Sequence, residues 1–238
     1  MIKFLYDIDK DAENWVDTVK NTRPSWGINY GEETKMVPDD LKGKILRADD
    51  KEAIKLVKSY FRSQSRFNSK KEFLSSEIEA VKEAWNGKEK SFFRIIEDLT
   101  KKPLFSRVFT AYFTTMFICP YDEEKYKWFM LSMWHSLPFQ ITTICHEIFH
   151  FQFLYYYADF CREEGLNENQ LENIKEALTS LLNTEEFDDI ILSQDPGYSN
   201  HQAIRQRILD VWQKDKLSYL KDKNGFEVFL KRIIKDIK

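Results

Sequence analysis

The longest apolar stretch of the chain, residues 137–160, does most to limit how the chain can fold. A stretch of this length must be buried within a protein or lie in a bilayer. Polar and ionisable side chains interrupt it at His146, Glu147, His150, Gln152 and Asp159. Such groups are costly in the hydrocarbon of a membrane, so the stretch predicts a buried helix and no membrane span. We expect this helix from about Pro138 to Glu164, with Gly165 just beyond its end.

Two of the chain's four histidines lie in this predicted helix, four residues apart. Positions i and i+4 share one face of a helix, so His146 and His150 can reach the same metal ion. Glu147 places a carboxylate beside the open side of that ion, where a water molecule would bind. The pattern His-Glu-x-x-His is the arrangement of zinc hydrolases. Two such histidines can also arise by chance, with both rings hydrogen-bonded in a core, but the intervening glutamate makes a chance match rare.

A hydrolytic zinc site uses three protein ligands and leaves a fourth position for water. The sequence offers His201, Glu172 and Glu176 as the third ligand. We favour Glu176, because small residues at 177, 179 and 180 would let its helix approach the metal-binding helix closely. Glu172 lies among polar residues that suggest a solvated first turn. Either glutamate also suits an ordinary place on the protein surface.

Composition argues against several classes of protein. The 238 residues are 42% hydrophobic and 15% aromatic, enough for a large core. A formal net charge of −3 gives no basic excess, so we expect no nucleic-acid partner. Three cysteines form no Cys-x-x-Cys pair and cannot all be paired with one another, which argues against a disulfide scaffold. Asp7 and Asp9 stand where a signal peptide needs apolar residues, so we expect a cytoplasmic protein.

Helical periodicity dominates the first hundred residues. In chain order we expect a strand at 2–8, a helix over 11–20 capped by Asp9, a structured loop at 22–33, an irregular stretch around Pro38 and Gly43, and amphipathic helices over 49–67, 70–85 and 92–99. These elements form a mainly helical N-terminal region, residues 1–103, which we separate from a second domain, residues 104–238.

The amino-acid composition changes at the start of the second domain. Residues 106–118 are rich in β-branched and aromatic side chains, which predicts a strand, and residues 126–134 predict another. The break between them indicates an antiparallel hairpin. After the long helix we expect a helix at 167–183 with Asn167 and Gln170 in a capping box, a turn at 195–198, and helices at about 200–213 and 225–237. The expected class is α+β, mostly helical, with a small antiparallel sheet before the long helix.

His146-Glu147-x-x-His150 followed by Glu176 resembles the gluzincin branch of the zincin metallopeptidases. The resemblance covers about residues 104–215. It implies a zincin-like fold, with an antiparallel sheet just before the motif helix and Glu176 as a metal ligand on the next helix. The chain departs from the family pattern at two positions. Gln152 stands where an apolar residue is preferred, and Ser180 stands where some gluzincins carry a supporting acidic residue.

The resemblance implies a Zn²⁺-dependent peptidase acting on a peptide or protein substrate. Zinc would lower the pKa of a bound water and polarise the scissile carbonyl. Glu147 would take the proton from the attacking water and return it to the leaving amine. Tyr198 or His201 are candidates for the donor that stabilises the oxyanion, although each also suits a structural role in the turn.

Two other functions stay open at the level of the sequence. The chain can be a non-catalytic or regulatory zinc-binding domain that acts through a protein partner. It can also be a structural zinc domain without turnover. Residues 1–103 would contact the partner in the first case, and would cover or frame the cleft if the protein is an enzyme. No particular oligomeric state is indicated.

Overall fold

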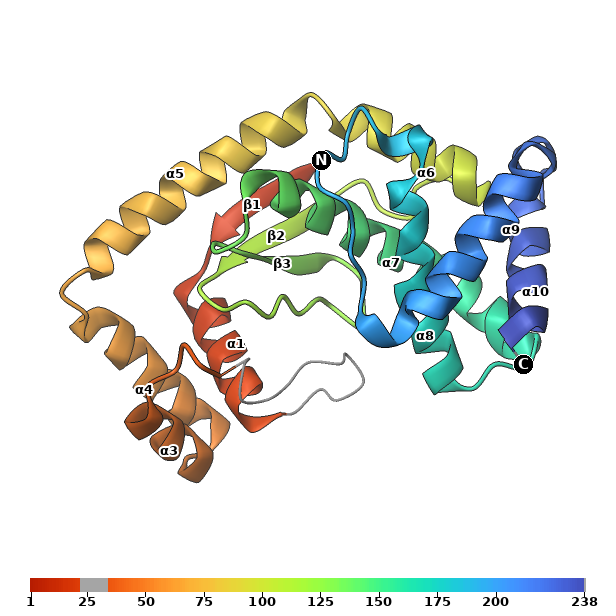
Figure 1. The fold of residues 1–238 in the computed structure, drawn as a ribbon. Coiled ribbons are helices and arrows are strands. Elements are labelled where there is room, and N and C mark those ends of the chain that lie inside the picture. Colours follow the sequence, from red (N-terminus) through yellow and green to blue (C-terminus); the bar gives the residue numbers. More distant parts are fainter. Residues whose placement is uncertain (22–33, 238) are drawn as a thin grey trace. The chain divides into compact units, whose positions relative to one another are not determined.

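The computed structural model describes residues 1–21 and 34–237 (Figure 1). The chain forms two compact units, each assembled from two separate stretches. Unit 1 contains Met1–Ala84 and Val108–Gln140, and unit 2 contains Trp85–Arg107 and Ile141–Lys238. The single division expected after residue 103 stays a prediction. We describe each unit by itself.

In unit 1 the described residues form a three-stranded sheet in the order β1-β2-β3 (Figure 1). The strands are β1 (Ile2–Tyr6), β2 (Phe109–Thr114) and β3 (Trp128–Ser132). Both pairings are parallel, and Ala111 of the middle strand faces Phe4 on one side and Phe129 on the other. The strand expected at 2–8 is thus confirmed, and it pairs with a strand more than a hundred residues further along.

The expected antiparallel hairpin over 106–134 is wrong. Both strands are shorter than the β-rich stretches that predicted them, which leaves residues 115–127 as the connection. A connection of this length can return to the opposite end of the sheet, so β3 runs parallel to β2. Tyr121, on the way back, makes an isolated antiparallel bridge with Phe129. Apolar residues continue beyond Thr114, so the composition alone does not locate the end of β2.

Three helices of unit 1 enclose their own apolar core. These are α1 (Ile8–Lys20), α3 (Asp39–Arg47) and α4 (Asp50–Ser63), and their buried side chains include Trp15, Ile45 and Val57. Asp7 caps α1 by accepting a hydrogen bond from the N–H of Asp9 at 2.8 Å, so the expected cap at Asp9 is two residues late. The loop predicted at 22–33 lies outside the described residues.

Helix α3 lies where the sequence predicted an irregular stretch, and that prediction is wrong. Pro38 occupies the N-cap position, where a missing N–H removes no intrahelical hydrogen bond. Leu41 and Ile45 are buried, and their packing outweighs the cost of Gly43 inside the helix. Tertiary burial therefore overrides a local signal here.

The regular secondary structure of unit 2 is helical throughout its described residues. Two helices, α5 (Phe67–Asn86) and α7 (Leu137–Glu163), each begin in unit 1 and end in unit 2. The remaining elements are α6 (Glu89–Thr100), α8 (Glu168–Leu178), the 3₁₀ turns η2 (Thr179–Asn183), η3 (Glu185–Phe187) and η4 (Ser199–His201), α9 (Gln202–Lys221) and α10 (Gly225–Ile237). The expected helices are present, and the capping box of Asn167 and Gln170 is confirmed. The helix expected at 167–183 ends at Leu178 and continues as η2, and the one expected at about 200–213 extends to Lys221. The α+β class with mostly helical content is confirmed, while its sheet is parallel.

Gln152, one of the two departures from the zincin pattern, anchors a neighbouring segment of unit 2. Its side chain on α7 is fully buried. Its Oε1 accepts a hydrogen bond from the N–H of Phe105 at 3.2 Å, and its Nε2 donates to Thr100 and to the carbonyls of Lys102 and Pro103. A buried amide with these partners explains why this position is polar.

Among the described residues, we find no helix that is both long enough and apolar enough to cross a bilayer. Several polar side chains of α7 are buried within the protein. His150 and Gln152, for example, are each at most 2% exposed.

The carboxylate of Asp11 ties α1 to the sheet in unit 1. Its Oδ1 accepts hydrogen bonds from the hydroxyl of Thr114 and the N–H of Thr115, and its Oδ2 accepts from the hydroxyls of Thr115 and Tyr6. We predict that Asp11→Ala lowers the free energy of unfolding by about 3 kcal/mol, because buried donors lose their acceptor. The exposed Glu13 on the same helix is the control, and Glu13→Ala should cost at most about 0.5 kcal/mol. Urea unfolding measures both, and equal losses would contradict the role of Asp11.

Candidate metal centre

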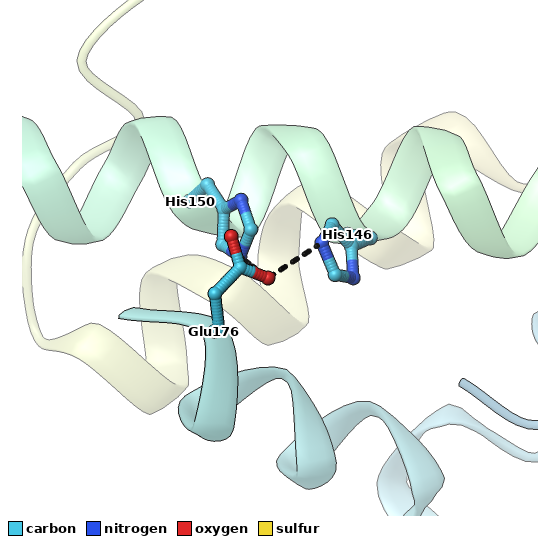
Figure 2. A group of neighbouring side chains, drawn as sticks. All are labelled: His146, His150 and Glu176. Atoms are coloured by element: carbon cyan, nitrogen blue, oxygen red, sulfur yellow. Dashed lines mark ion pairs between the residues drawn. The ribbon is translucent and has the colours of Figure 1, made fainter. Parts of the chain in front are cut away.

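Two imidazoles of α7 and one carboxylate of α8 converge in unit 2. Figure 2 shows His146 and His150 on successive turns of α7, with Glu176 reaching towards both rings from the neighbouring helix. The Nε2 atoms of His146 and His150 each lie 3.6 Å from Oε2 of Glu176. The three potential ligand atoms lie within 4.8 Å of one another. The i, i+4 spacing therefore places both rings on one face, as the sequence predicts.

The spacing of these three groups suits a metal ion better than a hydrogen-bond network. A distance of 3.6 Å is too long for an N–H···O hydrogen bond. Two ligand atoms bound tetrahedrally at about 2.1 Å from zinc would be about 3.4 Å apart. Oε2 of Glu176 is buried and has no hydrogen-bond partner among the residues that the structure describes. A buried carboxylate oxygen without such a partner is costly, and a cation between the three side chains would remove that cost.

The structure separates the two glutamates considered as the third ligand. Glu176 is 5% exposed and belongs to the converging group. Glu172, one turn earlier on α8, has a side chain that is 36% exposed and forms an ion pair with Lys175 at 2.6 Å. The small residues Ala177, Thr179 and Ser180 are fully buried, as expected if their helix packs closely against its neighbours. Glu176, and not Glu172, thus lies with the histidines.

A further carboxylate, Asp195, supports His146 from a loop. Its Oδ2 lies 2.8 Å from Nδ1 of His146. A carboxylate on one ring nitrogen orients the imidazole and directs the other nitrogen towards a metal. The sequence predicts Asp195 only as part of the turn at 195–198. The available signal was an acidic residue in a tight turn after the ligand helix, in a chain that lacks the supporting acid at position 180.

The loop around Asp195 is held in place by several polar contacts. The side chain of Asn183 pairs with the backbone of Asp195 through two hydrogen bonds of 2.8 Å. The N–H of Gly197 donates to Oδ1 of Asp195 at 2.9 Å. Arg205 on α9 donates to the carbonyl of Asp195 at 2.7 Å and lies 3.6 Å from Oδ1. Elements η2 and α9 therefore fix the carboxylate that fixes His146.

Burial and charge act against each other on the ligand groups. Burial lowers the pKa of His146, but the charge and hydrogen bond of Asp195 overcome this and hold that pKa well above its ordinary value. Burial also raises the pKa of Glu176, yet His150, His146 and Lys175 together hold it well below the usual range. Burial dominates at His150 and lowers its pKa. These shifts favour the ionised form of Glu176 and disfavour a proton on His150, and metal binding requires both forms.

Glu147 is a buried carboxyl group next to the two histidines. Its side chain is 9% exposed, and Oε2 lies 3.9 Å from Nδ1 of His150 without a hydrogen-bond partner among the described residues. Burial raises the pKa of Glu147 to about 7, against the opposing charge of His146. A carboxylate with a pKa near neutrality can accept a proton and release it again, which suits a general base.

His201 and Tyr198 lie together at the turn before α9. His201 is 2% exposed, and its Nε2 lies 3.0 Å from Oδ1 of Asn173 and 3.2 Å from Nδ2 of Asn200. It does not belong to the converging group of potential ligands. The ring of Tyr198 stands edge-on to that of His201 at a centroid distance of 5.9 Å. Neither contact tests a role in stabilising an oxyanion, which stays a prediction for both residues.

Comparison with known proteins finds no match to a family model, to a curated protein or to a solved structure. The resemblance to gluzincins therefore depends on the motif and on the side-chain geometry of α7 and α8.

Gly197 is required by the loop that holds Asp195. Its φ is +57°, and a Cβ there would lie 2.6 Å from the guanidinium of Arg205. We predict that Gly197→Ala lowers the free energy of unfolding by roughly 2 kcal/mol, because the left-handed backbone is strained for alanine. Gly87 is the control, since a Cβ there meets nothing within 4 Å. Thermal unfolding of both variants measures the difference, and a Gly197→Ala variant as stable as Gly87→Ala would contradict this account.

Proposed function

We propose that this chain is a zinc-dependent metallopeptidase of the gluzincin type, with His146, His150 and Glu176 as metal ligands. The equal distances of 3.6 Å from Oε2 of Glu176 to the two Nε2 atoms are the observation that carries the proposal. Two imidazoles and one glutamate are the ligand set of catalytic zinc in several peptidases. The proposed substrate is a peptide or protein.

Each polar group of the centre has a part in the proposed reaction. When bound, zinc supplies a Lewis acid that polarises the scissile carbonyl and lowers the pKa of water. Glu147 accepts the proton of the attacking water and passes it to the leaving amine, and its pKa of about 7 suits both steps. Asp195 holds His146 in the tautomer that leaves Nε2 available. Tyr198 and His201 remain candidates for donating to the oxyanion.

The ligand assignment predicts that the two glutamates of α8 respond differently to substitution. Glu176→Ala removes a ligand, so the affinity for zinc should fall by at least about 100-fold. Glu172→Ala removes an acceptor of Lys175 without removing a ligand, so its affinity should change much less. Competition with a chromophoric chelator measures both dissociation constants. A larger loss in Glu172→Ala than in Glu176→Ala would reverse the assignment.

Replacing the proposed base separates catalysis from metal binding. Glu147→Gln keeps the size of the side chain but cannot accept the proton, so hydrolysis of a peptide library should fall by about 10²–10⁴-fold. Bound zinc, measured by elemental analysis of the same preparation, should stay near the wild-type content. If wild type binds zinc but hydrolyses no member of the library, the result favours a zinc domain that acts through a protein partner.

A further inference from the structure

Lys175 is an unusual residue in unit 2, because it is a lysine with only 1% of its surface exposed. Its Nζ lies 2.6 Å from Oε1 of Glu172 and 3.1 Å from Oε1 of Glu176. Lysine side chains rarely lie fully inside a protein, and a buried ammonium is costly unless it is paired. The location of this lysine beside a candidate metal ligand therefore calls for an explanation in the chemistry of the site.

The two oxygens of Glu176 have different neighbours. Oε1 is paired with the ammonium of Lys175, whereas Oε2 lies 3.6 Å from both imidazole Nε2 atoms. Oε1 of Glu172 also pairs with Nζ of Lys175, at 2.6 Å. Turning the carboxylate so that both oxygens face the histidines would break a buried ion pair, which is strongly unfavourable.

We propose that Lys175 is a positioning residue that limits Glu176 to one donor oxygen and thereby makes the centre selective for a four-coordinate ion. This inference rests on the metal centre proposed above, and it does not depend on peptidase activity. Calcium and manganese favour more oxygen ligands than zinc does, and they often use both oxygens of a carboxylate. A glutamate restricted to one oxygen disfavours those ions and suits zinc.

Charge contributes in the same direction. Glu147, Glu176 and Asp195 bring three buried carboxyl groups to the centre. An uncompensated group of carboxylates would attract any divalent cation. Two cations reduce this excess negative charge, Lys175 next to Glu176 and Arg205 next to Asp195. Selectivity among divalent cations then depends on the type and number of ligands, and two imidazole ligands favour zinc.

Lys175→Met tests the proposal, because methionine keeps much of the apolar stem and removes the ammonium. Full-length apoprotein is loaded with Co²⁺, whose visible absorption weakens as its coordination number rises. We expect strong absorption for wild type and a clear loss in Lys175→Met. We also expect the ratio of zinc to manganese affinity to fall about tenfold, the size of effect typical of groups that support metal ligands. Lys175→Arg, which restores a cation, should recover part of both signals.

Lys216 is a control, because its ammonium also pairs with two glutamates, Glu185 and Glu186, which do not belong to the ligand group. Lys216→Met should leave the cobalt spectrum and the affinity ratio unchanged. If Lys175→Met does not fold, Glu172→Gln provides the test. This change weakens the ion pair that holds Lys175, so the visible absorption of bound Co²⁺ should again be weaker than in wild type.

The outcomes distinguish this inference from the proposed function. Unchanged cobalt spectra and affinity ratios in folded Lys175→Met, or in Glu172→Gln if the first variant fails, overturn the role of Lys175 and leave the metal centre intact. A wild-type protein that takes up neither zinc nor cobalt overturns the proposed function and this inference together.

Discussion

The constraint on which unit 2 depends is the burial of three carboxyl groups, those of Glu147, Glu176 and Asp195, around two histidines of α7. Carboxylates removed from water are costly unless cations or hydrogen-bond donors approach them. Much of the surrounding structure supplies such groups. Lys175 lies against Glu176, while Arg205 and Asn183 hold Asp195. Helices α8 and α9 are thus tied to α7 by the electrostatics of the centre as well as by apolar packing.

Even with these partners, the centre favours an added positive charge. In the protein without metal, a proton on His146 supplies it, because Asp195 holds the pKa of that imidazole well above its ordinary value. The proposed metal would displace this proton from Nε2, so the proton and the metal would compete for one position. Asp195 therefore has two effects: it makes His146 a stronger base, and it orients the ring so that the base is directed at Glu176.

The predictions from sequence succeeded where an element is determined locally. The capping box at Asn167 and the i, i+4 pair of histidines depend on neighbouring residues, and the structure contains both. Contacts between distant residues were not accessible in this way. The direction of β3 depends on how residues 115–127 return, and the pairing of Asp195 with His146 joins positions far apart in the chain. Likewise, burial of α3 overrode a local glycine signal.

The parallel sheet also changes how the resemblance to gluzincins can be used. The expected fold has an antiparallel sheet just before the motif helix, whereas the strands of unit 1 are parallel. Function depends on the site more than on the fold that carries it. The proposal of a zinc hydrolase therefore depends on the convergence of α7 and α8, and on the contact of Asp195 with His146 in a chain that has Ser180 where some gluzincins carry a supporting acid.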